Sequence, residues 1–148
     1  MVAYIRHRFS FFFRQEQGVV ADILGLIFFG YFAVVTVAFI VNFLMASTYQ
    51  GDLNYAAKQE MGTMSEQNGA DAGSEQRFRN MIKVMGHDPN KVTFSATPQT
   101  VQRYDPLYIH YTSTYPLWAY KFLGMPNETL QIDETIPGVA RKLLRGGG

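Results

Sequence analysis

Residues Ile23 to Ala46 read ILGLIFFGYFAVVTVAFIVNFLMA, and this run determines how the rest of the chain is interpreted. It holds no acidic, basic or histidine side chain, and only Thr36 and Asn42 are distinctly polar. As an α-helix it would measure roughly 36 Å, enough to cross a hydrocarbon core of about 30 Å. We therefore predict a transmembrane helix. Two alternatives stay open: a buried core helix of a soluble domain, and a secretory signal, whose apolar region is usually only about 7–15 residues long.

The two flanks of this run differ in charge. Residues 1–18 carry three arginines against one glutamate, whereas residues 47–148 carry equal numbers of basic and acidic side chains. Positive charge near the end of a transmembrane helix favours the cytoplasmic side. We therefore expect a basic cytoplasmic leader at 1–18, a transmembrane helix at 19–46 and an extracytoplasmic domain at 47–148.

An apolar stripe continues the helix beyond the membrane. Tyr49, Leu53, Ala57 and Met61 recur at every fourth position, and charged residues such as Glu60 occupy other faces. This spacing predicts one helix of about forty residues, half in lipid and half amphipathic, packed on a domain.

A loop and a second, shorter helix follow this long helix. The composition of residues 62–73 indicates the loop. Ser74 is then expected to cap the short helix, which ends at Gly86 and has Arg77 on its polar side.

The remaining sequence changes to the period of two that is typical of strands. Val92, Phe94 and Ala96 alternate with polar residues, and the same alternation recurs over 107–115 and from Leu130 to Ile136. The prediction is an α+β fold in which a long N-terminal helix and a short helix accompany a small antiparallel sheet of about three strands.

The composition excludes several kinds of chemistry. The chain has 148 residues, a formal net charge of +1 and no cysteine. It therefore lacks thiol catalysis and disulfides, and its low charge argues against nucleic-acid binding. The three histidines, His7, His87 and His110, lie far apart in the sequence and show no metal-ligand spacing. We expect no enzyme activity, no cofactor and no metal site.

Two features are candidates for function rather than packing. Asp22 lies at the start of the apolar run, where the helix dipole favours an acid, or where a positive partner in an assembly would be needed. The second feature is an apolar loop between the last two strands, which is expected to fold under the domain, touch the membrane surface or meet a neighbour. Its candidate interface residues are Tyr115, Leu117, Trp118, Tyr120 and Phe122.

The order of these features resembles bacterial type IV pilin-like proteins, and most closely the TadE-like pseudopilins of the Tad pilus system. The specific motif is short: a basic and acidic cluster, Arg14-Gln15-Glu16-Gln17-Gly18, then an apolar residue and an acid, then the apolar run. The rest of the resemblance is architectural and covers the whole chain, including a closing strand at about Thr129 to Thr135.

The resemblance implies a function. A prepilin peptidase would cut between Gly18 and Val19, and the mature subunit would pack through its apolar helix with copies of itself or related subunits. The family's acid stands at the fifth mature position and pairs with a neighbour's N-terminal amine, whereas Asp22 here would be the fourth residue. The implied localisation is the bacterial cytoplasmic membrane, with a single pass, or a cell-surface pilus. The alternative is a single-pass membrane protein whose outer domain binds a ligand or protein.

Overall fold

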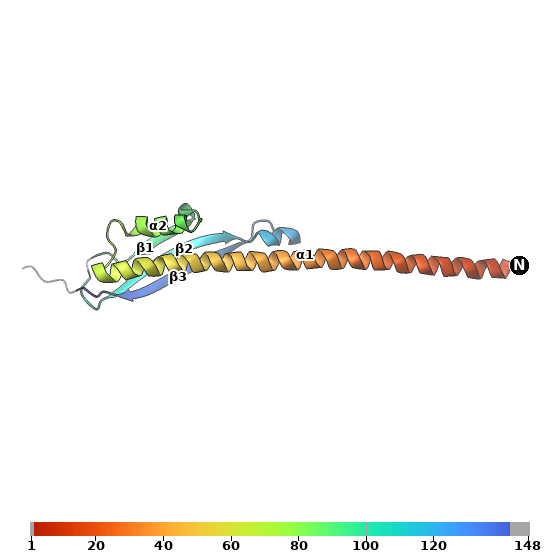
Figure 1. Cartoon of the computed structure of the whole chain (residues 1–148), viewed down its shortest axis with the longest axis horizontal. Helices are drawn as coiled ribbons and strands as arrows, with labels where there is room; N and C mark the ends of the chain where they lie inside the picture. The colour runs from red at the N-terminus through yellow and green to blue at the C-terminus, as the bar shows by residue number, and fades with distance from the viewer. Residues whose placement is uncertain (1, 100, 143–148) are drawn as a thin grey trace, which may run out of the picture. The chain divides into compact units, whose positions relative to one another are not determined.

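The computed structural model describes the backbone of residues 2–99 and 101–142, and the side chains of 20–99 and 101–142. Within these residues the elements follow the order α1, α2, η1, β1, β2, η2, β3 (Figure 1). The chain divides into an N-terminal unit, 1–41, and a C-terminal unit, 42–148.

The long helix α1 runs over Val2–Gln67 and is longer at both ends than the sequence predicted. Residues 2–17 contain neither proline nor glycine, so nothing in them interrupts a helix. The expected loop at 62–73 is wrong over its first half, because the helix continues as far as Gln67 and buries Met64 in the core. Asn68 then ends it with a positive φ of 60°.

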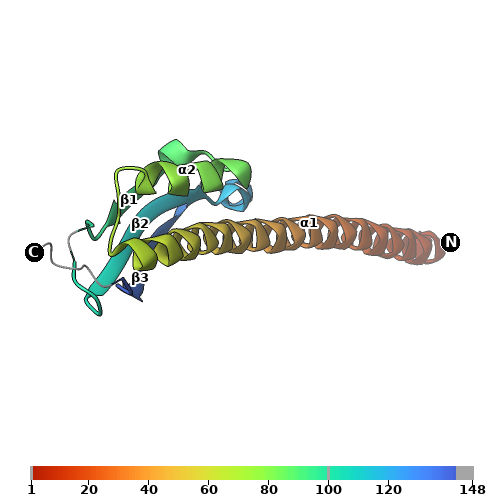
Figure 2. The same ribbon diagram turned by 60° about the vertical axis from the view of Figure 1, so that its left-hand side comes forward.

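The C-terminal unit has two layers. Strands β1 (Val92–Ala96), β2 (Pro106–Pro116) and β3 (Thr129–Val139) form an antiparallel sheet in that order. The last turns of α1 and the helix α2 (Ser74–Val84) lie along this sheet (Figure 2). The predicted fold class, a long helix and a short helix with a three-stranded antiparallel sheet, is confirmed.

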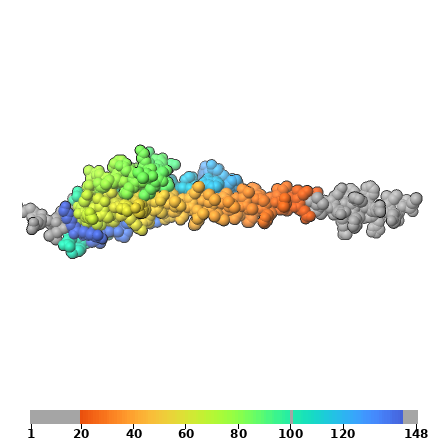
Figure 3. All heavy atoms as spheres, in the orientation of Figure 1, coloured from red at the N-terminus to blue at the C-terminus, as the bar shows by residue number. Residues whose placement is uncertain are grey.

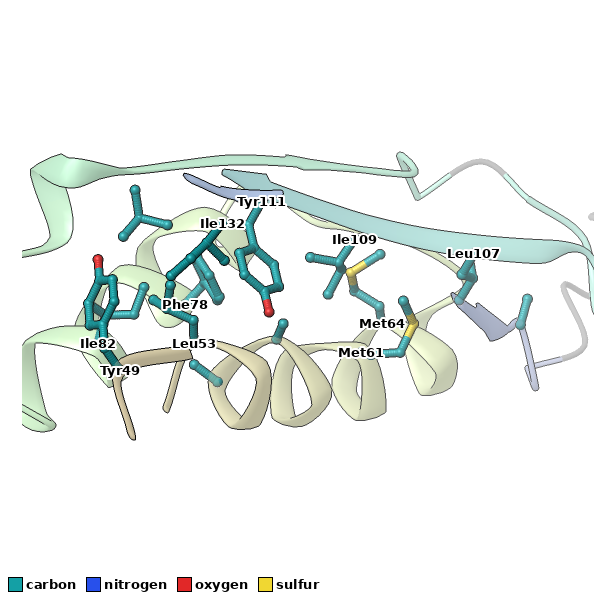
Figure 4. Close-up of a cluster of buried hydrophobic side chains, with 14 residues drawn as sticks. Tyr49, Leu53, Met61, Met64, Phe78, Ile82, Leu107, Ile109, Tyr111 and Ile132 are labelled. Carbon is teal, nitrogen blue, oxygen red and sulfur yellow. The ribbon is translucent and has the colours of Figure 1, made fainter. Parts of the chain in front are cut away.

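The core lies between the helices and one face of the sheet (Figure 4). All four residues of the predicted α1 stripe are buried, and so are Leu107, Ile109 and Tyr111 on one face of β2. Because side chains alternate along a strand, the other face of β2 is directed away from this core. The main core residues are Tyr49, Leu53, Ala57, Met61, Met64, Phe78, Ile82, Leu107, Ile109, Tyr111 and Ile132.

The strand β3 packs closely against the side chain of Met61 on α1. A Cβ atom at Gly138 would collide with the side chain of Met61. The strand also contains Pro137, which is tolerated because β3 lies at an edge of the sheet. The strand continues beyond the predicted end at Thr135, to Val139, because it stays paired with β2 as far as Pro106.

The end of α1 and the end of the described chain are tied together. The side-chain amide of Asn68 donates to the backbone oxygen of Lys142 at 2.5 Å and accepts from the Lys142 amide at 2.9 Å. The amide of Arg141 donates to the Ser65 carbonyl oxygen at 2.8 Å. These bonds hold the residues that follow β3 against the last turn of α1.

Two buried tyrosines give opposite predictions for the same chemical change. The Tyr49 hydroxyl shares a hydrogen bond of 2.6 Å with Ser113 Oγ, whereas the Tyr111 hydroxyl points toward α1 and is buried without a hydrogen-bond partner (Figure 4). Tyr49→Phe should therefore lower the free energy of unfolding by about 1 kcal/mol, and Tyr111→Phe should leave it unchanged or raise it by about 1 kcal/mol. Denaturant unfolding of the full chain in mild detergent measures both; an equal loss in both variants would contradict this packing.

The wild type and the Tyr111→Phe variant should also differ in how their stability depends on pH. Burial, assisted by Glu134, raises the pKa of Tyr111 from 10.0 to about 12. The unfolded chain therefore loses this proton first, and stability should fall between pH 10 and about 12. Tyr111→Phe should reduce this alkaline loss of stability relative to the wild type.

Candidate functional site

The first described part of α1 presents an apolar surface on nearly all sides. Side chains from Val20 to Val41 are exposed except Val35, Ala38 and the half-buried Phe39. Residues with more than half of their surface exposed include Leu26, Ile27, Phe28, Phe29 and Phe32. By length and composition, α1 is the one helix in the described residues that is long and apolar enough to cross a membrane. The segment from Val20 to Val41 would span about 33 Å.

The predicted processing and pairing residues lie at the start of this surface. Gly18 and Val19 fall within the α1 backbone, but their side chains are outside the described residues. Asp22 is exposed. Cleavage after Gly18 and pairing of Asp22 both remain predictions. The predicted end of the transmembrane helix, between residues 46 and 47, also remains a prediction. The C-terminal unit, as defined by contacts within the chain, begins at Asn42.

The predicted interface loop forms a short 3-10 helix, η2 (Trp118–Leu123), between β2 and β3. Its aromatic residues do not share one environment. Tyr115 is half-buried and packs on Tyr49, with 5.4 Å between ring centroids. Leu117, Trp118 and Tyr120 are also half-buried, whereas Phe122 is 43% exposed. The loop thus partly folds under the domain and partly faces outward.

A buried amide attaches η2 to α1. Asn42 is 2% exposed, and its Oδ1 accepts a hydrogen bond of 3.2 Å from the backbone N–H of the buried Ala119. Figure 3 shows η2, in blue, against α1. The sequence marked Asn42 as unusual, because it is one of only two distinctly polar residues in the apolar run. Its hydrogen-bond partner could not be predicted locally, because it lies 77 positions away.

A second polar site lies inside the C-terminal unit, where the sequence predicted none. Glu60 is 1% exposed, and both its oxygens accept hydrogen bonds from the guanidinium of Arg77, at 2.8 and 3.1 Å. Arg77 also contacts Asp71 at 2.9 Å. Arg77 therefore joins α1, α2 and the connection between them, rather than lying on a solvated helix face as expected.

Ser74 belongs to the same group. It is the first residue of α2 rather than its cap, which is Gly73. Its buried hydroxyl donates to Asp71 Oδ1 at 3.1 Å and also lies 3.0 Å from Arg77. The preference of serine for helix starts was a correct signal, but its hydroxyl bonds to the loop and not to the free amides of the helix.

The charges of this cluster shift one another's ionisation. Hydrogen bonds to Glu60, and then to Asp71, raise the pKa of Arg77. The hydrogen bond to Arg77 lowers the pKa of Asp71 below its ordinary value of 3.8. The ion pairs thus favour the charged forms, and the cluster stabilises the packing of α2 on α1. It contains no arrangement that points to catalysis.

The histidines of the C-terminal unit form separate pairs. His87 Nε2 lies 2.7 Å from Asp52 Oδ2, and His110 Nδ1 lies 3.6 Å from Asp133 Oδ1. Across residues 20–99 and 101–142, no three His, Cys, Asp or Glu side chains gather to hold a metal ion. His7 lies outside the residues with described side chains.

Comparison with known proteins gives no match to a family model, to a curated protein or to a solved structure. The resemblance to TadE-like pseudopilins therefore rests on the sequence motif and on the architecture alone.

The buried ion pair predicts a matched contrast between two glutamates. Glu60→Gln weakens a charged hydrogen-bonded pair that is buried on one side, and we expect it to lower the free energy of unfolding by about 1–3 kcal/mol. Glu75→Gln makes the same change in the exposed i,i+4 pair with Arg79 and should cost less than about 0.5 kcal/mol. Denaturant unfolding of both variants measures the difference; equal costs would show that burial of Glu60 has no energetic consequence.

The lowered pKa of Asp71 predicts acid sensitivity. Because its pKa is lower in the folded chain than in the unfolded chain, its contribution is present above about pH 3.8 and is lost as pH falls below that value. Asp71→Asn should remove this component, so the stability difference between wild type and variant should shrink from pH 7 to pH 3. Melting temperatures across this range test it, and a constant difference would disprove the assignment.

Proposed function

We propose that this chain is a membrane-anchored, pilin-like structural or assembly subunit of a bacterial pilus or secretion-type apparatus, of the TadE-like kind. The proposal is supported by a contrast between two parts of α1, one with exposed and one with buried apolar side chains. Its residues from Val20 to Val41 expose apolar side chains almost all round, whereas its residues from Tyr49 to Met64 form the floor of an α+β core. One helix thus supplies both an anchor and a domain scaffold.

The mechanism follows from what an all-round apolar helix does. In a bilayer such a surface is covered by lipid, or by the same surface of other helices, so like subunits associate through van der Waals packing. Gly25 and Gly30 have open space at their Cβ positions, which leaves room for the backbone of a neighbouring helix to approach. The proposal assigns Asp22 to pairing with a positive group of a neighbour.

The proposal also fixes an orientation. The arginine-rich leader at 1–18 stays in the cytoplasm, and the C-terminal unit lies outside the cytoplasmic membrane. A prepilin peptidase is the partner that would remove the leader between Gly18 and Val19. Other copies or related subunits are the partners that would pack against the helix.

The mature N-terminus of protein purified from its native membranes tests this proposal. The proposal predicts that the first residue is Val19, that Gly18→Leu leaves the chain uncut, and that the wild type co-purifies with a large assembly in mild detergent. Gly25→Leu should keep the cleavage but weaken the assembly, and it serves as the matched control for the effect of added bulk. An intact Met1, together with a monomer in mild detergent, would contradict it.

The alternative, a single-pass protein with a ligand-binding outer domain, has one observation in its favour. A shallow cavity of about 420 Å³ lies along α1 in the C-terminal unit, lined by Ser47, Gln50, Gly51, Asn54, Tyr55 and Lys58. The Asn54 side-chain oxygen is buried there without a hydrogen-bond partner. An intact Met1 in the mature protein would favour this alternative.

A further inference from the structure

The end of η2 and the residues just after it carry exposed apolar side chains. Leu123 is 52% exposed and Met125 is 49% exposed, and Phe122 beside them is 43% exposed. Lys121 is exposed in the same segment. We refer to Lys121, Phe122, Leu123 and Met125 as the η2 patch. Exposed apolar side chains gathered in this way mark contact with a partner or a membrane.

The position of the η2 patch along α1 is fixed by a buried hydrogen bond. Ala119, at the start of η2, donates to Asn42, which is the first residue of the C-terminal unit. On α1 the next three residues are also exposed and apolar: Phe43 at 74%, Leu44 at 59% and Met45 at 52%. The beginning of the C-terminal unit therefore presents apolar side chains from two separate segments, α1 and η2.

This position lies close to the expected end of the membrane span at Ala46. A helix from Val20 to Val41 covers about 33 Å, slightly more than the hydrocarbon core, so Asn42 falls among the headgroups. The composition of η2 fits that depth, because Trp and Tyr are enriched at the membrane interface, and lysine keeps its charged end in water while its stem lies on apolar surface. Trp118 and Phe122 pack edge to face, with 6.4 Å between ring centroids.

We propose that the η2 patch rests on the bilayer surface and seats the C-terminal unit on the headgroup layer of the leaflet where α1 emerges. The occupant is a phospholipid surface, and the argument for it is continuity along the chain: Asn42, which binds η2, directly follows the apolar span that ends at Val41. This inference rests on the membrane anchoring in the proposed function, but not on assembly with other subunits or on removal of the leader.

Single-cysteine labelling tests the contact directly, since the chain has no cysteine of its own. Leu123→Cys places an environment-sensitive dye on the η2 patch. Val84→Cys, on α2 and 87% exposed, is the matched control outside the patch. Both full-length variants are reconstituted at low protein density into vesicles of phosphatidylcholine and phosphatidylglycerol, with and without bromine on the upper acyl carbons. Flotation establishes insertion.

The expected result is that brominated lipid quenches the dye at position 123 by more than about half and leaves the dye at position 84 nearly unchanged. Trp118, the single tryptophan, should be quenched by the same lipid in the unlabelled protein.

If the protein floats and the two dyes behave alike, the inference fails while membrane anchoring stands. If the dye at 123 is protected, and the unlabelled Leu123→Cys variant forms a disulfide with a second copy under a mild added oxidant, the patch is a contact between subunits and the inference is overturned. If the protein does not float, the anchoring itself fails, and this inference fails with it.

Discussion

The apolar stripe of α1 from Tyr49 to Met64 is the surface on which the C-terminal unit assembles. The sheet contributes Leu107, Ile109 and Tyr111 to it, and α2 contributes Phe78 and Ile82. A small sheet needs a covered hydrophobic face to be stable, and the stripe of α1 supplies that cover. The close approach of Gly138 to Met61 and the bonds from Asn68 to Lys142 show that the end of β3 and the residues after it are fitted to this helix.

The surface of α1 changes in character along its length. Over Val20–Val41 its side chains are apolar on nearly every side, which suits lipid or a bundle of similar helices. Beyond Asn42 one face is buried and other faces carry polar groups such as Asp52 and Lys58.

Polar groups inside the C-terminal unit specify how its parts meet. The Glu60 carboxylate has almost no exposure to water, and burying it is costly unless it is paired. Arg77 satisfies it with two hydrogen bonds and extends the contact to Asp71 in the connection between the helices. A shift of α2 along α1 would leave a buried charge without its partner, so the cluster fixes the register of two helices that apolar contacts alone would hold loosely.

Much of the architecture was predictable because it depends on local periodicity. The stripe at Tyr49, Leu53, Ala57 and Met61 and the alternation along 107–115 both reflect which side chains one face must bury. The end of α1 was missed because glycine and polar residues after Met61 indicate a loop, whereas tertiary packing of Met64 keeps the helix intact. The pairing of Glu60 with Arg77 and of Asn42 with Ala119 depends on contacts between distant residues, which no local pattern reveals.

The candidate site shows the same limit. The apolar run identified a helix that is long and apolar enough to cross a membrane, and the aromatic loop was recognised as unusual. Which of its residues are buried and which are exposed followed only from the placement of η2 beside Asn42.

The most direct measurement of the central claim is whether the chain behaves as an integral membrane protein. Membranes containing the full chain are washed with alkaline carbonate and then extracted with mild detergent, alongside a variant in which Phe28, Phe32 and Val37 are replaced by Asp. The account predicts that the wild type stays in the carbonate pellet and is released only by detergent, whereas the variant enters the supernatant. Release of the wild type by carbonate alone would contradict it.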